Sequence, residues 1–167
     1  MNAWPKQSEM DKFYGNPRGT NGKASPKWEA ENIVKILAKD LPFLIYYDGK
    51  AVSGIRVHRK VKDAFLRVLN RIWVASGKSQ AKVDEWGMSK FGGCFLFRLK
   101  RSGTTLSTHS YACAFDFDPA NNGFRDPTPR FAKFPEVLAA WKAEGFVWGG
   151  DWKGNTDGMH WQAAIVG

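Results

Sequence analysis

The chain has 167 residues with 25 Lys and Arg against 16 Asp and Glu, a formal net charge of +9. Its length fits one domain, and 43% hydrophobic residues with 14% aromatic residues can build a core, which excludes a disordered chain. No segment reaches the roughly 20 apolar residues that span a bilayer, and residues 1–13 lack the apolar stretch of a secretory signal. We therefore expect neither membrane insertion nor a signal peptide.

The two cysteines, Cys94 and Cys113, are too few for a disulfide framework and lack the Cys-x-x-Cys spacing of a structural zinc site. We expect two core thiols, and a single bridge between them stays open as an alternative. The sequence therefore gives cysteine no catalytic role.

The positive charge belongs to the first part of the chain. Residues 1–101 hold 20 basic and 9 acidic residues, a net +11, whereas residues 102–167 hold 5 and 7, a net −2. A basic surface attracts polyanions such as nucleic acid or an anionic cell wall. No zinc-finger spacing, basic region with heptads or RNA-binding aromatic motif is present, so nucleic acid is not an expected partner.

The first half of the chain predicts an arm, a hairpin and a helix. Residues 1–27 are rich in Gly, Pro, Asn and Lys, which predicts an irregular surface arm. Residues 31–39 fit either a short helix after a Ser-Pro start or, as we favour, a strand. An Asp-Gly turn joins 42–47 and 51–58 into a hairpin, and apolar residues at helical spacing predict a helix over 59–75.

The second half predicts mainly strands. Residues 94–100 alternate as a strand, and 106–118 form a strand with small and acidic side chains on one face. Residues 135–144 begin with Pro and stop before Gly, as a short helix does. Final strands are expected at 146–150 and 158–166. This order predicts one α+β domain with a mostly antiparallel sheet and two or more helices.

Two of the three histidines lie near an aspartate on predicted strand faces. A catalytic zinc ion takes three His, Asp, Glu or Cys ligands and keeps a fourth position for water. His109, Asp116 and His160 meet that requirement, and Asp157 is then free to act as general base. By spacing alone, both histidines also fit ordinary hydrogen-bonded side chains with aspartates in turns or caps.

The segments STHSYACAFD (107–116) and DGMH (157–160) resemble peptidase family M15, the zinc D-Ala-D-Ala carboxypeptidases and L-alanyl-D-glutamate endopeptidases. The family pattern is SxHxxGxAxD, followed later by an acidic residue, two spacers and His. Arg98 and the segments GGDW, FYGNP and IRVHRKV are similar to phage-encoded members. Two departures are Ala112, where the family has Gly, and Asp157, where many members have Glu.

The resemblance implies a hedgehog/DD-peptidase-like fold, with a zinc peptidase catalytic domain over 28–167. It also implies roles for six side chains. Arg98 binds substrate or stabilises the developing oxyanion, since a fixed cation acts strongly in a cleft that excludes water. The implied set is Zn²⁺ on His109, Asp116 and His160, Asp157 as catalytic base, and Arg98 and Ser107 as substrate contacts.

Other polar residues receive secondary interpretations. Asp151 lies in the same loop as Asp157 and is a rival base. His58 is expected to be a structural or surface histidine, and Cys113 faces away from Asp116 and is rejected as a ligand. Asp118 is expected in a turn or in contact with a ligand residue. Among the tryptophans, 148 and 152 are candidates for a substrate groove, and 161 is expected in the core.

The resemblance implies a zinc peptidoglycan hydrolase, and phage-type similarity implies an endolysin that cuts between L-Ala and D-Glu. Such an enzyme would stay in the host cytoplasm until it is released to the wall, and we expect a monomer that adsorbs through its basic part. The alternatives are a D-Ala-D-Ala carboxypeptidase of the same family and a non-catalytic basic module that binds wall polymer or nucleic acid.

Overall fold

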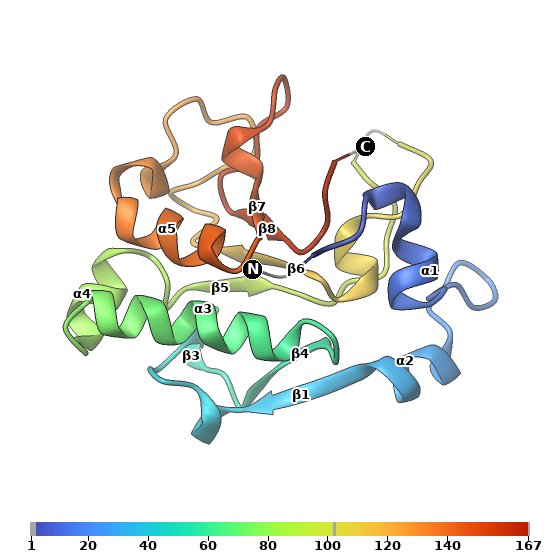
Figure 1. The fold of residues 1–167 in the computed structure, drawn as a ribbon, viewed down its shortest axis with the longest axis horizontal. Helices are drawn as coiled ribbons and strands as arrows, with labels where there is room; N and C mark the ends of the chain where they lie inside the picture. Colours follow the sequence, from blue (N-terminus) through green and yellow to red (C-terminus); the bar gives the residue numbers. More distant parts are fainter. Residues whose placement is uncertain (1–2, 102, 167) are drawn as a thin grey trace.

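A four-stranded antiparallel sheet forms the centre of the computed structural model, which describes residues 3–101 and 103–166 (Figure 1). The strands lie in the order β5, β6, β8 and β7, so distant parts of the chain become neighbours. Helices α3 and α5 contact each other and cover one face of this sheet. The bounds are β5 Phe91–Gly93, β6 Ala114–Phe117, β7 Val147–Trp148, β8 His160–Gln162, α3 Lys62–Ala75 and α5 Pro135–Ala143.

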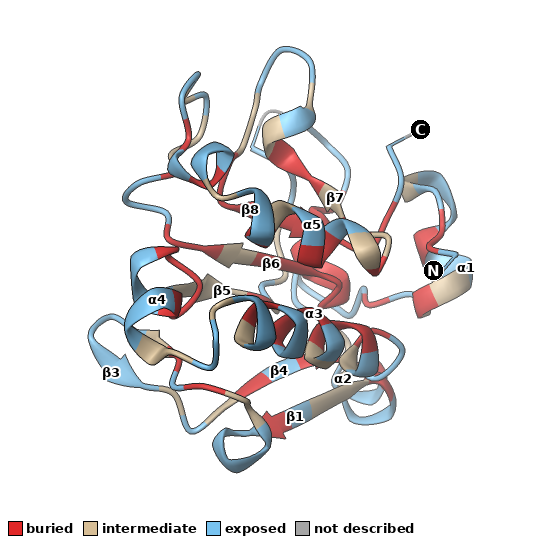
Figure 2. Ribbon diagram, turned by 60° about the vertical axis from the view of Figure 1, so that its left-hand side comes forward, coloured by how far each residue is buried: buried red, intermediate tan, exposed pale blue. Residues whose placement is uncertain are grey.

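A second antiparallel pair joins β1 (Ile33–Leu37) to β4 (Gly54–His58) over five residues on each strand. Figures 1 and 2 both place α3 between this pair and the four-stranded sheet. The strands β2 (Tyr46–Tyr47) and β3 (Lys50–Ala51) form a small hairpin. The α+β class and the antiparallel sheets predicted from the sequence are therefore confirmed.

Side chains alternate along β6 and β8, so one face of the central sheet packs in the core and the other carries Asp116 and His160. Phe115 of β6 stacks on Phe65 of α3 with ring centroids 4.0 Å apart, and Trp161 of β8 stacks on Trp141 of α5 at 4.9 Å. The next residue on β6 therefore points to the opposite face. These rings are fully buried and give the strands a rigid support. Figure 2 shows the buried residues of β6 and β8 in red.

The two predicted helices are confirmed. In α3 the predicted apolar stripe is buried, and α5 starts at Pro135 as expected. Gly145 follows the end of α5 with a φ of 80°, in the left-handed region that glycine favours after a helix. None of the helices in the described residues has the length and apolarity that crossing a membrane requires.

The ambiguous segment 31–39 contains both of the predicted structures in succession. Helix α2 (Pro26–Asn32) begins at Ser25, whose side chain accepts a hydrogen bond from the backbone N–H of Trp28, and β1 follows it. The expected hairpin of 42–47 with 51–58 forms only next to its turn, and the rest of the prediction is wrong. Only β2 and β3 pair across the Asp-Gly turn, because β4 pairs with β1 instead.

The predicted strand at 94–100 is wrong. The backbone groups of Arg98 are taken by a side chain: its N–H donates to Ser110 Oγ at 3.0 Å, and that hydroxyl donates to its carbonyl at 2.8 Å. Because Ser110 replaces a neighbouring strand here, the sheet edge lies earlier, at β5. The stretch before β5, read as a plain connection, also holds α4 (Gln80–Glu85).

The arm expected at 1–27 is not irregular throughout. It contains α1 (Met10–Tyr14), and Trp4, Met10 and Tyr14 are buried in the core. The Tyr14 hydroxyl donates to the carbonyl of Ala163 at 2.6 Å, close to the far end of the chain. The large apolar side chains of this segment indicate burial, but the prediction followed its Gly and Pro content instead.

Candidate metal centre

Local structure brings His109, Asp116 and His160 together. His109 lies on η3, a 3-10 helix over Thr108–Tyr111 that begins at Ser107, whose hydroxyl accepts from the His109 N–H at 3.2 Å. The chain then turns at Ala112, which adopts a left-handed φ of 55°, and enters β6. Asp116 and His160 are direct partners in the pairing of β6 with β8. A tight turn and one strand pair therefore place three potential ligands side by side.

The three side chains converge on Asp116. His109 Nε2 lies 3.3 Å from Asp116 Oδ2, and His160 Nδ1 lies 3.3 Å from Asp116 Oδ1. Each residue offers one ligand atom, and these atoms all lie within 4.8 Å of one another. Both histidines are buried, and Asp116 is partly buried. The cluster predicted from the sequence is thus present as a spatial group.

The outer nitrogen of each imidazole has a protein acceptor. His109 Nδ1 donates to the carbonyl of Cys94 at 2.7 Å, and His160 Nε2 donates to Gln162 Oε1 at 2.9 Å. Gln162 is oriented in turn, because its amide nitrogen donates to the carbonyl of Ala164 at 3.0 Å. These contacts fix the proton on the outer nitrogen and aim both inner lone pairs at Asp116, as in metal-binding histidines.

The donor set fits a divalent cation such as Zn²⁺. Asp116 Oδ1 is buried and has no hydrogen-bond partner, although two nitrogen lone pairs lie beside the carboxylate. Acceptors that face one another in this way repel unless a proton or a metal ion lies between them. Two imidazole nitrogens and one carboxylate oxygen are a common set for catalytic zinc.

The pKa shifts in the cluster have the same cause. Before a metal ion binds, a proton on an inner imidazole nitrogen can take its place. Burial raises the pKa of Asp116, but hydrogen bonds and positive charge from protonated His109 and His160 outweigh it and hold this pKa well below its usual range. Burial lowers the pKa of His160, but Asp116 outweighs it and raises the value above that of an ordinary histidine. The centre therefore favours positive charge at this position.

Asp157 lies beside the cluster with an unsatisfied oxygen. Its Oδ1 atom is buried without a hydrogen-bond partner, and burial is the main reason that its pKa is raised. Its backbone N–H donates to the carbonyl of Gly149 at 3.0 Å. A side chain at position 149 would lie 2.3 Å from the Asp157 carbonyl oxygen, so this close approach requires glycine.

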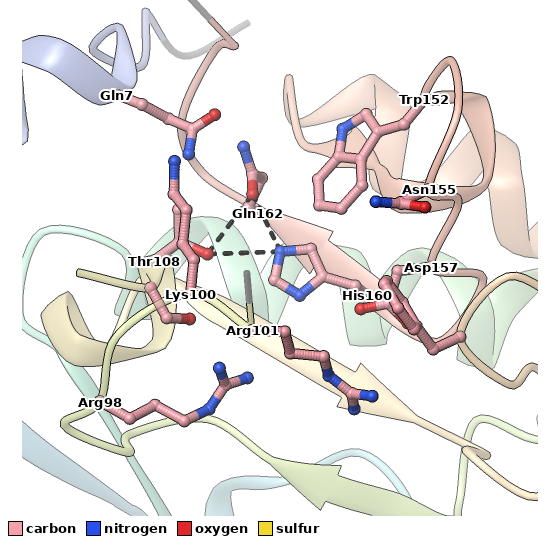
Figure 3. Close-up of a pocket in the computed structure, with 12 residues that line it drawn as sticks. Gln7, Arg98, Lys100, Arg101, Thr108, Trp152, Asn155, Asp157, His160 and Gln162 are labelled. Carbon is pink, nitrogen blue, oxygen red and sulfur yellow. Dashed lines mark hydrogen bonds between the residues drawn. The ribbon is translucent and has the colours of Figure 1, made fainter. Parts of the chain in front are cut away.

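A cavity of about 230 Å³ opens next to these groups (Figure 3). It is lined by five residues singled out from the sequence: Arg98, Ser107, Trp152, Asp157 and His160. The ring centroid of Trp152 lies 5.2 Å from that of His160. The arrangement can hold a metal ion, a buried carboxylate base and a fixed cation around one small substrate group.

A family model described as D-alanyl-D-alanine carboxypeptidase matches residues 100–163. The matched segment includes the metal cluster and Asp157. This match covers fewer than half of the 167 residues and supports the M15 peptidase family. No solved structure matches the chain at a significant level.

The backbone conformation at Ala112 shows what the replacement of the family's glycine costs. The family pattern has glycine here, and the left-handed φ of 55° is a conformation that glycine adopts without strain. Alanine tolerates it at a cost of about 1 kcal/mol. The position therefore keeps the turn that carries the chain from His109 into β6.

The structure separates Asp157 from its rival Asp151. The Asp151 carboxylate lies 2.9 Å from Lys142 Nζ at the surface and does not line the cavity. Asp118 occupies a turn, where its carboxylate accepts from Asn121 Nδ2 at 3.0 Å. Of these acidic residues, Asp157 is therefore the one that lines the cavity.

Cysteine and His58 take structural roles. Both cysteines are free and buried, and Cys113 Sγ donates to the carbonyl of Thr108 at 3.4 Å. His58 is buried and makes hydrogen bonds through both ring nitrogens. The predicted core position of Trp161 is confirmed. Trp148 is buried against Trp161 at 5.6 Å, so it does not line the cavity.

Seven cavity residues were missed from the sequence, among them Gln162, Lys100 and Arg101. Alternation in the last strand puts Gln162 on the face of His160, so a signal for it existed. No motif marks Lys100 and Arg101, which come from a segment whose predicted strand is wrong.

Proposed function

We propose that this protein is a zinc-dependent peptidoglycan peptidase that hydrolyses the amide bond between L-Ala and D-Glu in the stem peptide. The convergence of two oriented imidazoles and the unsatisfied Asp116 carboxylate, beside a cavity with a second carboxylate, carries this proposal. The family match supports a peptidase, and the choice of bond rests on the resemblance to phage-encoded members.

His109, Asp116 and His160 would hold the ion. A bound zinc ion supplies a Lewis acid that polarises the scissile carbonyl and increases the acidity of water. The chain's own contribution is to keep both imidazoles neutral and turned inward, through the acceptors Cys94 O and Gln162 Oε1.

Asp157 moves the proton. Its buried position raises its pKa, so it is a stronger base than an ordinary aspartate. It takes a proton from the attacking water and passes it to the departing amine. Since its Oδ1 has no protein partner, no hydrogen bond must break before this transfer.

Arg98 and Ser107 contact the substrate in this proposal. The backbone of Arg98 is held by Ser110 and by the Ser107 N–H, which donates to the Arg98 carbonyl at 2.9 Å. The guanidinium group is therefore presented from a fixed segment, where it stabilises the negative oxygen that develops on the attacked carbonyl.

The family description favours a second candidate, removal of a terminal D-Ala by a carboxypeptidase. We propose the endopeptidase activity as part of an endolysin that acts as a monomer, waits in the host cytoplasm and is released to the wall. The basic residues of 1–101 would then promote adsorption to anionic wall polymers.

The decisive experiment is mass spectrometry of fragments released from purified peptidoglycan by the zinc-loaded protein. A new N-terminus on D-Glu supports the endopeptidase, free D-Ala supports the carboxypeptidase, and wall binding without any product supports a non-catalytic module. Asp157→Asn should lower the rate about 10²–10⁴-fold. Asp151→Asn is the matched control and should retain the rate, and the reverse result would move the base to Asp151.

A further inference from the structure

Three cationic side chains line the cavity that also holds His160 and Asp157: Arg98, Lys100 and Arg101. Figure 3 shows the guanidinium groups of Arg98 and Arg101 below the His160 ring. No ion pair within residues 3–101 and 103–166 includes any of these three cations. Asp157 lies in the same cavity and its charge interacts with that of Arg101, so three cations face one carboxylate among the lining residues.

Arginines on α3 differ from these three. Arg67 Nε and Arg71 Nη2 lie 2.8 and 3.0 Å from the buried carboxylate of Glu144, so their charge is used within the fold. A cation that faces a cavity without such a partner is available to a ligand.

The backbone of Lys100 and the guanidinium of Arg101 are both held by contacts within the protein. The Lys100 N–H donates to the Thr105 carbonyl at 2.9 Å, which ties the backbone of these two residues together. The Arg101 guanidinium lies over the ring of Phe124, 4.6 Å from its centroid, and Phe124 also lines the cavity. Because these contacts orient the Lys100 backbone and one guanidinium, less conformational freedom is lost on binding.

From this arrangement we propose that Lys100 and Arg101, together with Arg98, bind a free carboxylate of the substrate peptide next to the scissile amide. Guanidinium and ammonium groups form charge-assisted hydrogen bonds with carboxylates, and arginine does so in a bidentate manner. The cavity of about 230 Å³ is shared with His160 and Asp157, so the bound anion must belong to a residue close to the reacting bond.

This inference rests on the proposed function, and it narrows the substrate class to acidic peptides. In a stem peptide whose D-Glu is linked onward through its side chain, the α-carboxylate of D-Glu remains free beside the L-Ala–D-Glu amide. The site therefore selects this form over a stem in which that carboxylate is amidated.

The test compares two synthetic stem peptides that differ only in this group, a free α-carboxylate or its amide. The zinc-loaded protein is given both peptides for hydrolysis, and it is titrated calorimetrically with uncleavable versions that carry an N-methylated scissile amide. The wild type should bind the acidic peptide about tenfold more tightly than the amidated one. In Lys100→Gln/Arg101→Gln this preference should fall to about twofold.

A charge-matched control removes two exposed lysines that do not line the cavity, as Lys39→Gln/Lys50→Gln. It should keep the wild-type preference, which separates local recognition from the loss of net charge. Equal binding of the two peptides by the wild type, or a preference that survives in Lys100→Gln/Arg101→Gln, overturns the proposal.

The hydrolysis assay tests the proposed function, and the calorimetric binding assay tests the carboxylate site. A binding preference without hydrolysis of either cleavable peptide leaves the carboxylate site standing and removes the peptidase assignment. Binding of poly(glycerol phosphate) that needs Lys100 and Arg101, with neither peptide bound, assigns these cations to a phosphate polymer and overturns the carboxylate site.

Discussion

The three histidines of this chain occupy two contrasting environments. His58, at the end of β4, is satisfied by backbone on both sides: Nε2 donates to the Tyr14 carbonyl at 2.9 Å, and Nδ1 accepts from the Lys60 N–H at 3.1 Å. His109 and His160 are equally buried, yet each has only its outer nitrogen paired with an acceptor and turns the inner one toward Asp116.

The difference shows that burial alone does not distinguish a metal ligand from a structural histidine. What distinguishes them is the partner of the second nitrogen. A backbone donor completes His58, whereas an acceptor-only carboxylate leaves His109 and His160 in need of a cation.

The largest effect is expected from Asp116→Ala. This change removes the carboxylate that faces both inner nitrogens, so zinc affinity should fall on the order of 10³-fold. Zinc content and competition with a chromophoric chelator measure it, and circular dichroism checks the fold. Asp151→Ala is the control, since that surface carboxylate pairs only with Lys142. Full zinc occupancy in Asp116→Ala would refute the assigned ligand set.

The next largest effect concerns His58 and pH. Burial, aided by Arg59 and Lys60, lowers its pKa to about 4, against 6.5 for an ordinary histidine. Between these values the unfolded chain takes up a proton that the folded protein excludes. The free energy of unfolding should therefore fall by about 3 kcal/mol from pH 7 to pH 4.

Urea unfolding of metal-free protein at both pH values measures this loss. His58→Gln should lack about 3 kcal/mol of the pH-dependent loss, because glutamine has no proton to bind. Contributions from Asp116 and the other two histidines are common to both proteins. An identical pH dependence in the two would show that His58 is not held neutral by the fold.

The smallest effect tests the orientation of His160. Gln162→Ala removes the acceptor of Nε2–H and should weaken zinc binding about 10–100-fold, while the ligands themselves remain. Gln162→Glu keeps an acceptor and should bind zinc at least as tightly as the wild type. Nitrogen-15 NMR of His160 should show a single tautomer in the wild type and a mixture in Gln162→Ala.

A control for this variant is Gln80→Ala, which removes a surface glutamine that contacts Leu44 and Asp84. Unchanged zinc affinity in Gln162→Ala, with Gln80→Ala also unchanged, would show that His160 is oriented by the strand alone.

The sequence predicted the site better than the fold around it. His109, Asp116 and His160 were selected through the resemblance to the M15 pattern, and the turn after η3 and the pairing of β6 with β8 bring them together. The amphipathic helix α3 was visible in the sequence itself, because its period is local.

Pairing between distant segments was not visible. Nothing local states that β4 pairs with β1, or that one hydroxyl of Ser110 takes both backbone groups of Arg98. The unpaired state of Lys100 and Arg101 likewise depends on which carboxylates lie nearby. These contacts join residues that are far apart in the sequence, so local patterns do not predict them.

Segments near the two termini pair with each other beside the cavity, which Gln7 lines. The N–H of Gln7 donates to the Ile165 carbonyl, and the N–H of Ile165 donates to the Pro5 carbonyl, both at 2.8 Å. The adjoining carbonyl of Ala164 anchors the amide that orients His160. A shortened protein that starts after α1 would thus retain His109, Asp116, His160 and Asp157. It would lose the backbone hydrogen bonds that hold Ile165 next to the Gln162 anchor. Fusions or tags placed near position 5 would disturb the same hydrogen bonds without removing any residue.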